Sequence, residues 1–151
     1  MAYYPYTKVQ LSLVISFVIN IMMMTNASIF KPRITEQFIS DLPQNTHLLY
    51  VHCQSRDDDL KVHTLKPGDQ FDFSFRRSIL GTTHFHCNFK WDTKYSEFDV
   101  FYREKSVCKY HEFTENDLYC TWLVKDSAIF LARTKHPSPS PSEFQFAYAW
   151  A

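Results

Sequence analysis

Short stretches in which apolar and polar residues alternate dominate the middle of the chain. In the stretch FDFSFR, Phe71, Phe73 and Phe75 fall on one face and polar residues fall on the other. The same alternation recurs in residues 84–91, 98–103 and 120–124. A period of two is typical of a β-strand that buries one face, because successive side chains of a strand point to opposite sides. The chain is therefore predicted to consist mainly of short strands.

Polar stretches separate these strands where turns are expected. Residues 66–69, with the sequence KPGD, favour a turn, and residues 54–59 and 92–97 are expected to be loops. Residues 28–46 are mixed in character and are expected to hold a short leading strand and a loop, and residues 105–117 a polar connection. About six to eight strands without a convincing helical period predict an all-β fold, a compact antiparallel β-sandwich.

The first 27 residues follow a different pattern. One basic residue, Lys8, precedes an apolar stretch at residues 11–24, and the small residues of TNAS follow. This order is typical of a secretory signal peptide cleaved near Ala27. An uncleaved membrane anchor is the alternative, but the stretch is shorter than the roughly 20 residues of a spanning helix. We therefore expect a secreted protein without stable membrane insertion, with residues 1–27 as its signal peptide.

The last 16 residues form a separate segment in the predicted domain organisation. The sandwich is expected to cover residues 28–135, and HPSPSPS, residues 136–142, reads as an extended and unpacked spacer. The aromatic sequence EFQFAYAWA follows it, either as an exposed contact patch or as an extra strand of the sandwich. A variable appendage without a role in the core is the favoured interpretation of residues 136–151.

Composition agrees with a single β-rich domain. A chain of 151 residues has room for one sizeable core. Aromatic residues make up 17% of it and only 2 residues are glycine, which favours half-buried strands over a helical bundle. The 16 basic and 16 acidic residues balance, so no strong field points to nucleic acid or to an anionic membrane as a partner.

Four cysteines, Cys53, Cys87, Cys108 and Cys120, follow the predicted signal peptide. An even number in a small secreted domain predicts two disulfides. No CxxC pair is present and the spacings do not match a zinc module, so no metal site is expected. The hairpin expected at residues 92–97 would bring Cys108 back towards Cys87. Cys87–Cys108 with Cys53–Cys120 is therefore the favoured pairing, and the two other connectivities stay open.

The densest group of charges lies in the loop at residues 54–59, which contains Arg56, Asp57, Asp58 and Asp59. Adjacent residues of an extended loop point in different directions, so the three carboxylates are not expected to converge on one ion. The alternating oxygen ligands and central glycine of an EF-hand loop are also missing. A solvated loop tip is the favoured interpretation, with a weak calcium site or a direct contact with a partner as alternatives.

Two histidines supply the main alternative chemistry. His84 and His86 are two residues apart on a predicted strand and share its outer face with Lys90. Such a set would suit a secreted hydrolase or nuclease, but nothing in the sequence shows that the other histidines converge on it. A Gly-x-Ser-x-Gly elbow is absent, and bridged cysteines exclude a thiol nucleophile. We therefore predict no enzyme, no catalytic residues and no cofactor.

Two further features of the sequence could form surface sites. A carbohydrate-binding module for cell walls would need exposed aromatic side chains, such as Phe101 or Tyr102, in a groove. The sequence Asn26-Ala27-Ser28 is a glycosylation sequon. It spans the expected cleavage point, so we do not expect Asn26 to carry a glycan.

Several of these stretches together resemble one protein family. The sequence VHCQSRDDDL, the Phe-rich FDFSFR, then FHCNFKW, FDVFY, a lone Cys108 and CTWLV follow in the order and spacing of the plant self-incompatibility protein homologues, often called S-protein homologues. The likeness runs from about Leu48 to Leu131. The chain departs from the family pattern at Lys61, where glycine is usual, at Phe73 in place of Trp, and at Ala128. The change at Lys61 is expected to affect the turn, because glycine permits backbone angles that lysine disfavours.

The resemblance implies a secreted β-sandwich with two disulfides, and the family carries no accepted catalytic residues. Its best-known member is a pistil ligand that a pollen receptor recognises. We therefore expect a secreted recognition ligand, a monomer, that binds an unidentified cell-surface receptor through its loops. Residues 54–59 are the first candidate contact, followed by residues 92–97 and 109–117.

Overall fold

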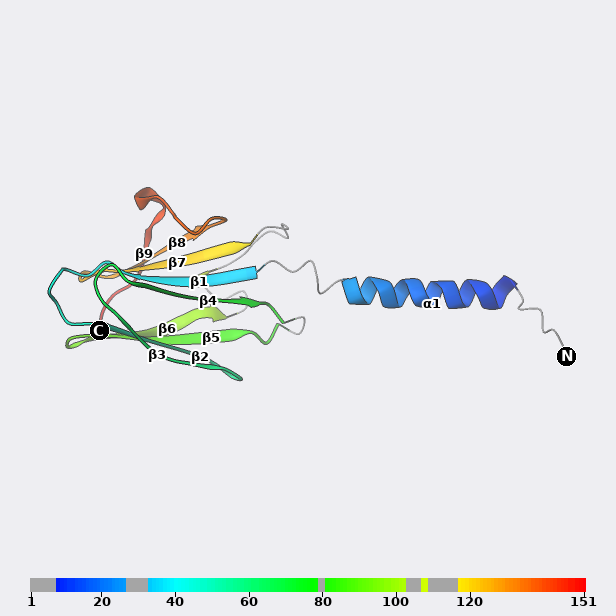
Figure 1. Ribbon diagram of the computed structural model, residues 1–151, viewed down its shortest axis with the longest axis horizontal. Coiled ribbons are helices and arrows are strands. Elements are labelled where there is room, and N and C mark those ends of the chain that lie inside the picture. The colour runs from blue at the N-terminus through cyan, green and yellow to red at the C-terminus, as the bar shows by residue number, and fades with distance from the viewer. Residues whose placement is uncertain (1–7, 27–32, 79–80, 103–106, 109–116) are drawn as a thin grey trace. The chain divides into compact units, whose positions relative to one another are not determined.

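The computed structural model describes residues 8–26, 33–78, 81–102, 107–108 and 117–151, and the chain divides into two units, residues 1–31 and 32–151 (Figure 1). The first unit contains helix α1, Lys8–Asn26. Among the described residues, no helix combines the length and the apolar character that crossing a membrane requires. The signal peptide and its cleavage near Ala27 stay predictions.

The described part of the second unit is built from strands, as the alternating pattern predicts. Their bounds are β1 Arg33–Ser40, β2 Leu49–Ser55, β3 Asp59–Leu65, β4 Gln70–Arg76, β5 His84–Trp91, β6 Lys94–Tyr102, β7 Leu118–Val124, β8 Ile129–Thr134 and β9 Gln145–Tyr148. A short 3-10 helix, η2, covers Pro141–Glu143 in the Pro/Ser-rich segment.

These strands form two facing sheets, which confirms the predicted β-sandwich (Figure 1). The five-stranded sheet has the order β4-β1-β7-β8-β9, and the four-stranded sheet has the order β3-β2-β5-β6. All pairs are antiparallel except β1 with β7, which run parallel. Strand β1 lies between β4, its antiparallel neighbour, and β7, its parallel neighbour.

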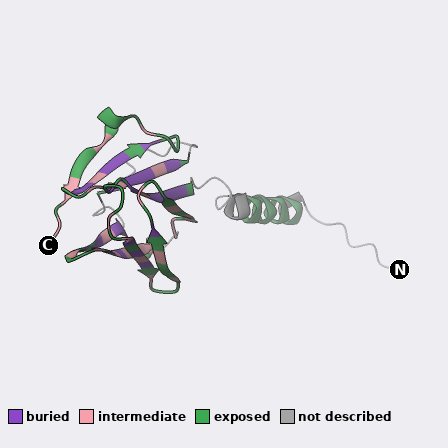
Figure 2. Cartoon of the chain, turned by 60° about the vertical axis from the view of Figure 1, so that its left-hand side comes forward, coloured by how far each residue is buried: buried purple, intermediate pink, exposed green. Residues whose placement is uncertain are grey.

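The core lies between the inner faces of the two sheets, where buried residues concentrate (Figure 2). Its largest fully buried side chains include Trp122, Phe38 and Phe89. The three phenylalanines of FDFSFR are only half-buried, because β4 is an edge strand, but they pack against this core as their alternation predicts. Removal of apolar surface from water contributes roughly 25 cal/mol for each square ångström, so the packing of these side chains stabilises the sandwich.

Strand β1 is longer and more buried than the predicted leading strand. Its sequence RITEQFIS looks mixed, yet most of it is buried. The polar side chains are buried in hydrogen bonds with neighbouring strands: Thr35 Oγ1 lies 2.8 Å from Ser74 Oγ, and Gln37 Oε1 accepts from Thr121 Oγ1 at 3.1 Å. Polar groups that are hydrogen-bonded to one another can be buried at little cost. A search for alternating apolar residues therefore does not detect this strand, because several of its buried side chains are polar.

Both disulfides are present, but the favoured pairing is wrong. Cys53 bonds Cys87, and Cys108 bonds Cys120. Strands β2 and β5 are neighbours, and their register places Cys53 directly opposite Cys87. The favoured pairing rested on inward-facing positions and on the proximity given by one hairpin, which do not show that β2 and β5 pair in one sheet while Cys120 belongs to the other sheet.

The aromatic tail is an integral strand, so the predicted appendage is wrong as well. Strand β9 pairs with β8, and the ring of Tyr148 stacks on Phe98 at 3.8 Å between centroids. Beyond it, the backbone of Ala151 exchanges hydrogen bonds of 2.8 and 3.4 Å with Tyr95 of β6. The segment therefore joins one sheet to the edge of the other.

Candidate functional site

The acidic loop, residues 54–59, connects β2 to β3 and has an exposed but ordered tip. The hydroxyl of Ser55 accepts hydrogen bonds from the backbone N–H groups of Asp57 at 3.3 Å and Asp58 at 3.0 Å. The N–H of Ser55 in turn donates to the carbonyl of Asp58 at 2.7 Å. The side chains of Arg56 and Asp57 are 88% and 85% exposed and lie 3.8 Å apart as an ion pair. The loop thus presents exposed charges on a backbone fixed by hydrogen bonds, next to the Cys53–Cys87 disulfide.

Asp59 differs from its two neighbours in the loop because it belongs to strand β3. Its carboxylate lies 2.8 Å from His52 Nε2 and accepts from the backbone N–H of Lys61 at 2.9 Å and from its Nζ at 3.1 Å. The hydrogen bond from His52, and then those from Lys61, hold the pKa of Asp59 far below its usual value. The carboxylate of Asp59 is therefore engaged within the protein, apart from the ion pair of Asp57 with Arg56.

Lys61 has a left-handed backbone, with a φ of 65°. This is the conformation that glycine adopts freely and other residues adopt at a cost. Lys61 thus adopts a backbone conformation that glycine would adopt without this cost, and its side chain contributes the Asp59 contact. The register of β2 and β3 is also irregular here, between His52 and Gln54.

His84 and His86 come together on the outer face of the four-stranded sheet through a residue that the sequence analysis did not single out. His84 Nε2 and His86 Nδ1 lie 2.7 and 2.9 Å from the same oxygen, Oδ1 of Asp99 on β6. Partial burial raises the pKa of Asp99, but the bonds to the two imidazoles outweigh it, so this pKa lies below its usual value.

An irregularity in the pairing of β5 with β6 shapes this face. The register shifts between Phe85 and His86, so that Val100 and Phe101, although adjacent, are both buried. A bulge of this kind changes the direction of the side chains that follow it. It also removes one predicted site, because Phe101 is buried and cannot serve as an exposed sugar platform, while Tyr102 packs beside His84.

The third member of the hypothetical hydrolase set lies apart from the histidines. Lys90 pairs with Tyr50 and Tyr95 on the neighbouring strands. It lies two residues beyond Asn88 along β5, further from the histidine pair. A pocket lined by Val107, Leu131, Arg133 and Gln145–Ala147 lies on the other sheet. The histidines are thus brought together, but Lys90 does not complete an acid–base site with them.

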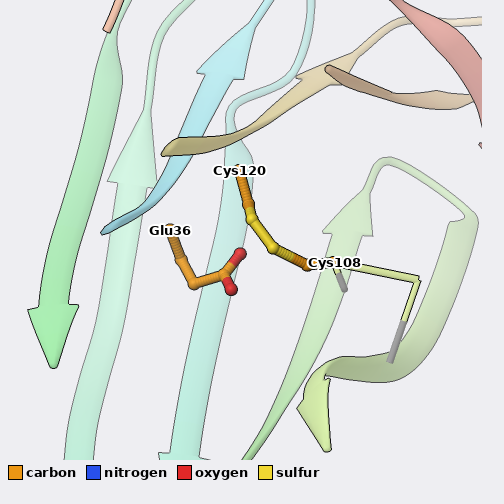
Figure 3. A group of neighbouring side chains, drawn as sticks. All are labelled: Glu36, Cys108 and Cys120. Atoms are coloured by element: carbon orange, nitrogen blue, oxygen red, sulfur yellow. A yellow bond between two sulfur atoms is a disulfide. The ribbon is translucent and has the colours of Figure 1, made fainter. Parts of the chain in front are cut away.

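A further polar group lies in the core. Glu36 is fully buried on β1, and its carboxyl group points towards the Cys108–Cys120 disulfide (Figure 3). Its Oε2 accepts from Trp122 Nε1 at 2.7 Å. Burial raises its pKa to about 8. One carboxylate oxygen and both sulfurs lie within 4.8 Å of one another, but the sulfurs are bonded to each other and offer no thiolate ligands.

The two other predicted contact loops are residues 92–97, which the structure describes in full, and residues 109–117, which lie almost entirely outside the described residues. The loop expected at residues 92–97 is shorter than predicted, because β6 starts at Lys94 and leaves a tight turn at Asp92 and Thr93. Asp92 takes a positive φ of 53° in this turn. Of residues 109–117, only Asp117 lies within the described residues, where its carboxylate accepts from the N–H of Arg33 at 3.0 Å.

The geometry defines a small, disulfide-bonded β-sandwich with polar loops and polar sheet faces on its outside. The chain matches the family described as plant self-incompatibility protein S1 over residues 36–150, so it belongs to this family. The match includes the C-terminal strand. The predicted resemblance to the S-protein homologues is confirmed.

Individual relatives agree with this assignment. S-protein homolog 2 of Arabidopsis thaliana is 39% identical over 77 residues, which is 51% of this chain and 47% of the relative. S-protein homolog 21 of the same plant is 31% identical over 64% of this chain and 70% of the relative. Self-incompatibility protein S1 of Papaver rhoeas is 33% identical over 57% of this chain and 59% of the relative. The match thus spans about half the length of the first of these relatives.

A solved structure shows the same fold. It belongs to an SPH protein, described as a member of "a widespread family of small, highly stable, secreted proteins from plants". The two structures superpose with a TM-score of 0.58 at 15% identity, covering 80% of this chain and 96% of the other. At this identity the likeness shows that the two chains share the β-sandwich fold.

Proposed function

We propose that this protein is a secreted recognition ligand, without enzymatic activity, that binds a cell-surface receptor through the acidic loop. The observation that carries the proposal is the combination of exposure and order at the loop tip. Arg56 and Asp57 are almost fully exposed, yet the backbone beneath them is fixed by the Ser55 hydroxyl. A loop that is already ordered loses little conformational entropy on binding.

The charges of the loop support a role in partner selection. Asp57 and Asp58 remain available at the tip, whereas the carboxylate of Asp59 is held by His52 and Lys61. Exposed charges at an interface mainly change the association rate and the discrimination between partners. The name of the Papaver rhoeas relative, self-incompatibility protein S1, describes a recognition process, which supports the same class of function for this chain.

The proposal is tested by binding of the labelled, secreted protein to plasma-membrane vesicles from plant tissues. Asp57→Asn with Asp58→Asn should lower the association rate, and the difference should shrink as salt is raised. Asp72→Asn with Asp126→Asn is a matched control, because it removes two exposed carboxylates elsewhere on the surface. Pretreatment of the vesicles with protease should abolish binding. Equal binding by both double variants would contradict the role of the loop.

The enzyme alternative has a separate test. His84 and His86 share one carboxylate oxygen of Asp99, an arrangement that fixes both rings against the sheet. We expect no ribonuclease or glycosidase activity from the purified protein. Activity that disappears in His84→Ala with His86→Ala, while the fold is retained, would replace the ligand proposal with the hydrolase.

We also propose that the ligand is a monomer. Its two-sheet core is closed within one chain, and the C-terminal segment covers the edge of β6 with the backbone of Ala151. Covered sheet edges reduce pairing between chains. Light scattering coupled to size-exclusion chromatography should give the mass of one chain, and a stable dimer mass would overturn this part of the proposal.

A further inference from the structure

The outer face of the four-stranded sheet carries two exposed tyrosines in one row. Tyr50 of β2 and Tyr95 of β6 both pair with Lys90 of β5, which lies between them. Residues directly opposite each other in an antiparallel sheet point to the same face. The two tyrosines are 43% and 41% exposed. Two strand spacings separate them, which is about 9–10 Å between their backbones.

The ring of Tyr95 lies along the sheet and does not stand away from it. Its hydroxyl donates a short hydrogen bond to Oε2 of Glu97 and lies 3.5 Å from Oδ1 of Asn88. Glu97 and Asn88 lie opposite each other. They form the next row of outward-facing side chains beside the row that holds Tyr95. A ring anchored in this way at its far end leaves one face open to solvent as a flat platform.

Planar polar side chains fill the row beside the tyrosines. His52, Asn88 and Glu97 follow one another across β2, β5 and β6. They offer imidazole, amide and carboxylate groups that hydrogen-bond in the plane of the group. Aromatic surface next to in-plane donors and acceptors suits a ligand with apolar faces and polar edges.

The charges on this face favour a neutral ligand. Its carboxylates, on Asp59, Glu97 and Asp99, are each within an ion pair's distance of a histidine. An anionic ligand would meet these three carboxylates, and a cation would compete with histidines that already occupy them. A ligand rich in hydroxyl groups can hydrogen-bond to the same side chains without adding charge.

We propose that this tyrosine face, formed by Tyr50, His52, Asn88, Lys90, Tyr95 and Glu97, binds a single chain of a neutral β-1,4-linked polysaccharide. The sugar rings of such a chain carry apolar C–H faces and equatorial hydroxyl edges, so alternate sugars stack on the two tyrosines while their hydroxyls meet the polar row. Strands of a sheet twist by roughly 20–25° from one to the next, so the two platforms follow one twisted chain better than a flat crystalline surface. The tyrosine face adjoins the acidic loop through the contact of His52 with Asp59 but does not include the loop tip at residues 56–58, so it does not depend on the receptor proposal.

The test uses the full secreted protein and cellohexaose as the probe, with affinity measured by isothermal titration calorimetry. Tyr50→Ala and Tyr95→Ala should each weaken binding about tenfold, since each removes one stacking platform. Tyr95→Phe keeps the ring but removes its hydrogen bond to Glu97, so it should bind more tightly than Tyr95→Ala. Phe146→Ala, which removes a 64% exposed aromatic ring from β9 on the other sheet, should leave the affinity unchanged.

Other outcomes would overturn the assignment. No detectable binding of cellohexaose at millimolar concentration would remove the glycan site, and an affinity of Tyr50→Ala and Tyr95→Ala that is unchanged from the parent protein would remove it from this face. Tighter binding of polygalacturonate than of cellohexaose would contradict a neutral ligand. Preferential depletion by crystalline cellulose would contradict a single chain. Asp57→Asn with Asp58→Asn should leave cellohexaose binding intact, so this test and the receptor test fail independently.

Discussion

Trp122 Nε1 donates a hydrogen bond of 2.7 Å to Oε2 of Glu36, and both side chains are fully buried. The other carboxyl oxygen, Oε1, has no hydrogen-bond partner among the described residues. Burial without a cation raises the pKa of Glu36 to about 8. The protein therefore keeps a neutral carboxylic acid in its core near pH 7, where an ionised one would be costly.

The first prediction follows from this pair and concerns pH. The folded protein holds the Glu36 proton up to a pH of about 8, whereas the unfolded chain releases it near 4.5. The folded state thus binds more protons across this window, so the stabilisation is complete below pH 4.5 and is lost as the pH rises through 8. The contribution amounts to at most about 5 kcal/mol. Urea unfolding between pH 4.5 and 9 should show stability falling with pH.

Glu36→Gln supplies the control for the pH prediction. It keeps an acceptor for Trp122 and removes the titrating group, so the decline of stability across this window should largely disappear. Glu143→Gln, at an exposed position, should retain the decline. If Glu36→Gln shows the same slope as the unchanged protein, another group is responsible.

The second prediction concerns the disulfides. Peptide mapping without reduction should yield linked peptides that contain Cys53 with Cys87 and Cys108 with Cys120. Their sequence separations are 34 and 12 residues, so replacing each pair by serine should cost about 4 and about 3 kcal/mol in the chain-entropy description. Linked peptides with Cys87 and Cys108 together would contradict the observed sheet register.

The third prediction compares two aromatic residues of β9. Tyr148→Ala removes the ring that stacks on Phe98 and should lower the free energy of unfolding by about 2–3 kcal/mol. Phe146→Ala, in the same strand but mostly exposed, should change it by less than about 0.5 kcal/mol. Chemical denaturation of both variants decides the matter, and equal effects would mean that β9 is only a peripheral attachment.

The fourth prediction uses the left-handed backbone at Lys61. Lys61→Gly and Lys61→Ala both remove the contact with Asp59, but only alanine keeps the cost of a positive φ. The glycine variant should therefore be more stable than the alanine variant by about 1 kcal/mol. Thermal unfolding of the two variants side by side measures this difference, and a more stable alanine variant would show that the turn adopts another conformation.

Much of the fold was accessible from the sequence because the strands alternate. The half-buried phenylalanines of β4 and the inward cysteines of β5 and β7 lie where the period of two places them. The turn signals between the strands predicted the sandwich, the even number of cysteines predicted the two disulfides, and the family motifs, such as VHCQSRDDDL, agree with both. Strand β1 was underestimated because Thr35, Glu36 and Gln37 look exposed in a pattern of polarity, while hydrogen bonds and a neutral carboxyl group allow their burial.

The parts that were mispredicted depend on which strands become neighbours. Hairpin proximity suggested a bond between Cys87 and Cys108, but the pairing of β2 with β5 sets Cys53 opposite Cys87. The same holds for the candidate sites. Asp99 meets His84 and His86 only because a bulge shifts β6 against β5, and Tyr50 and Tyr95 share a row only through Lys90. Such registers have no local signature in the sequence.

The position of β1 in the middle of its sheet has a consequence for when the chain can fold. One neighbour, β4, follows soon along the chain, but the other is β7, and Ile34 pairs with Leu118. Strand pairing between segments so far apart in sequence slows folding, since a large loop must close before the contacts form. The five-stranded sheet cannot assemble until the last third of the polypeptide has been synthesised. The four-stranded sheet, whose strands all lie within residues 49–102, can therefore form while the five-stranded sheet is still incomplete.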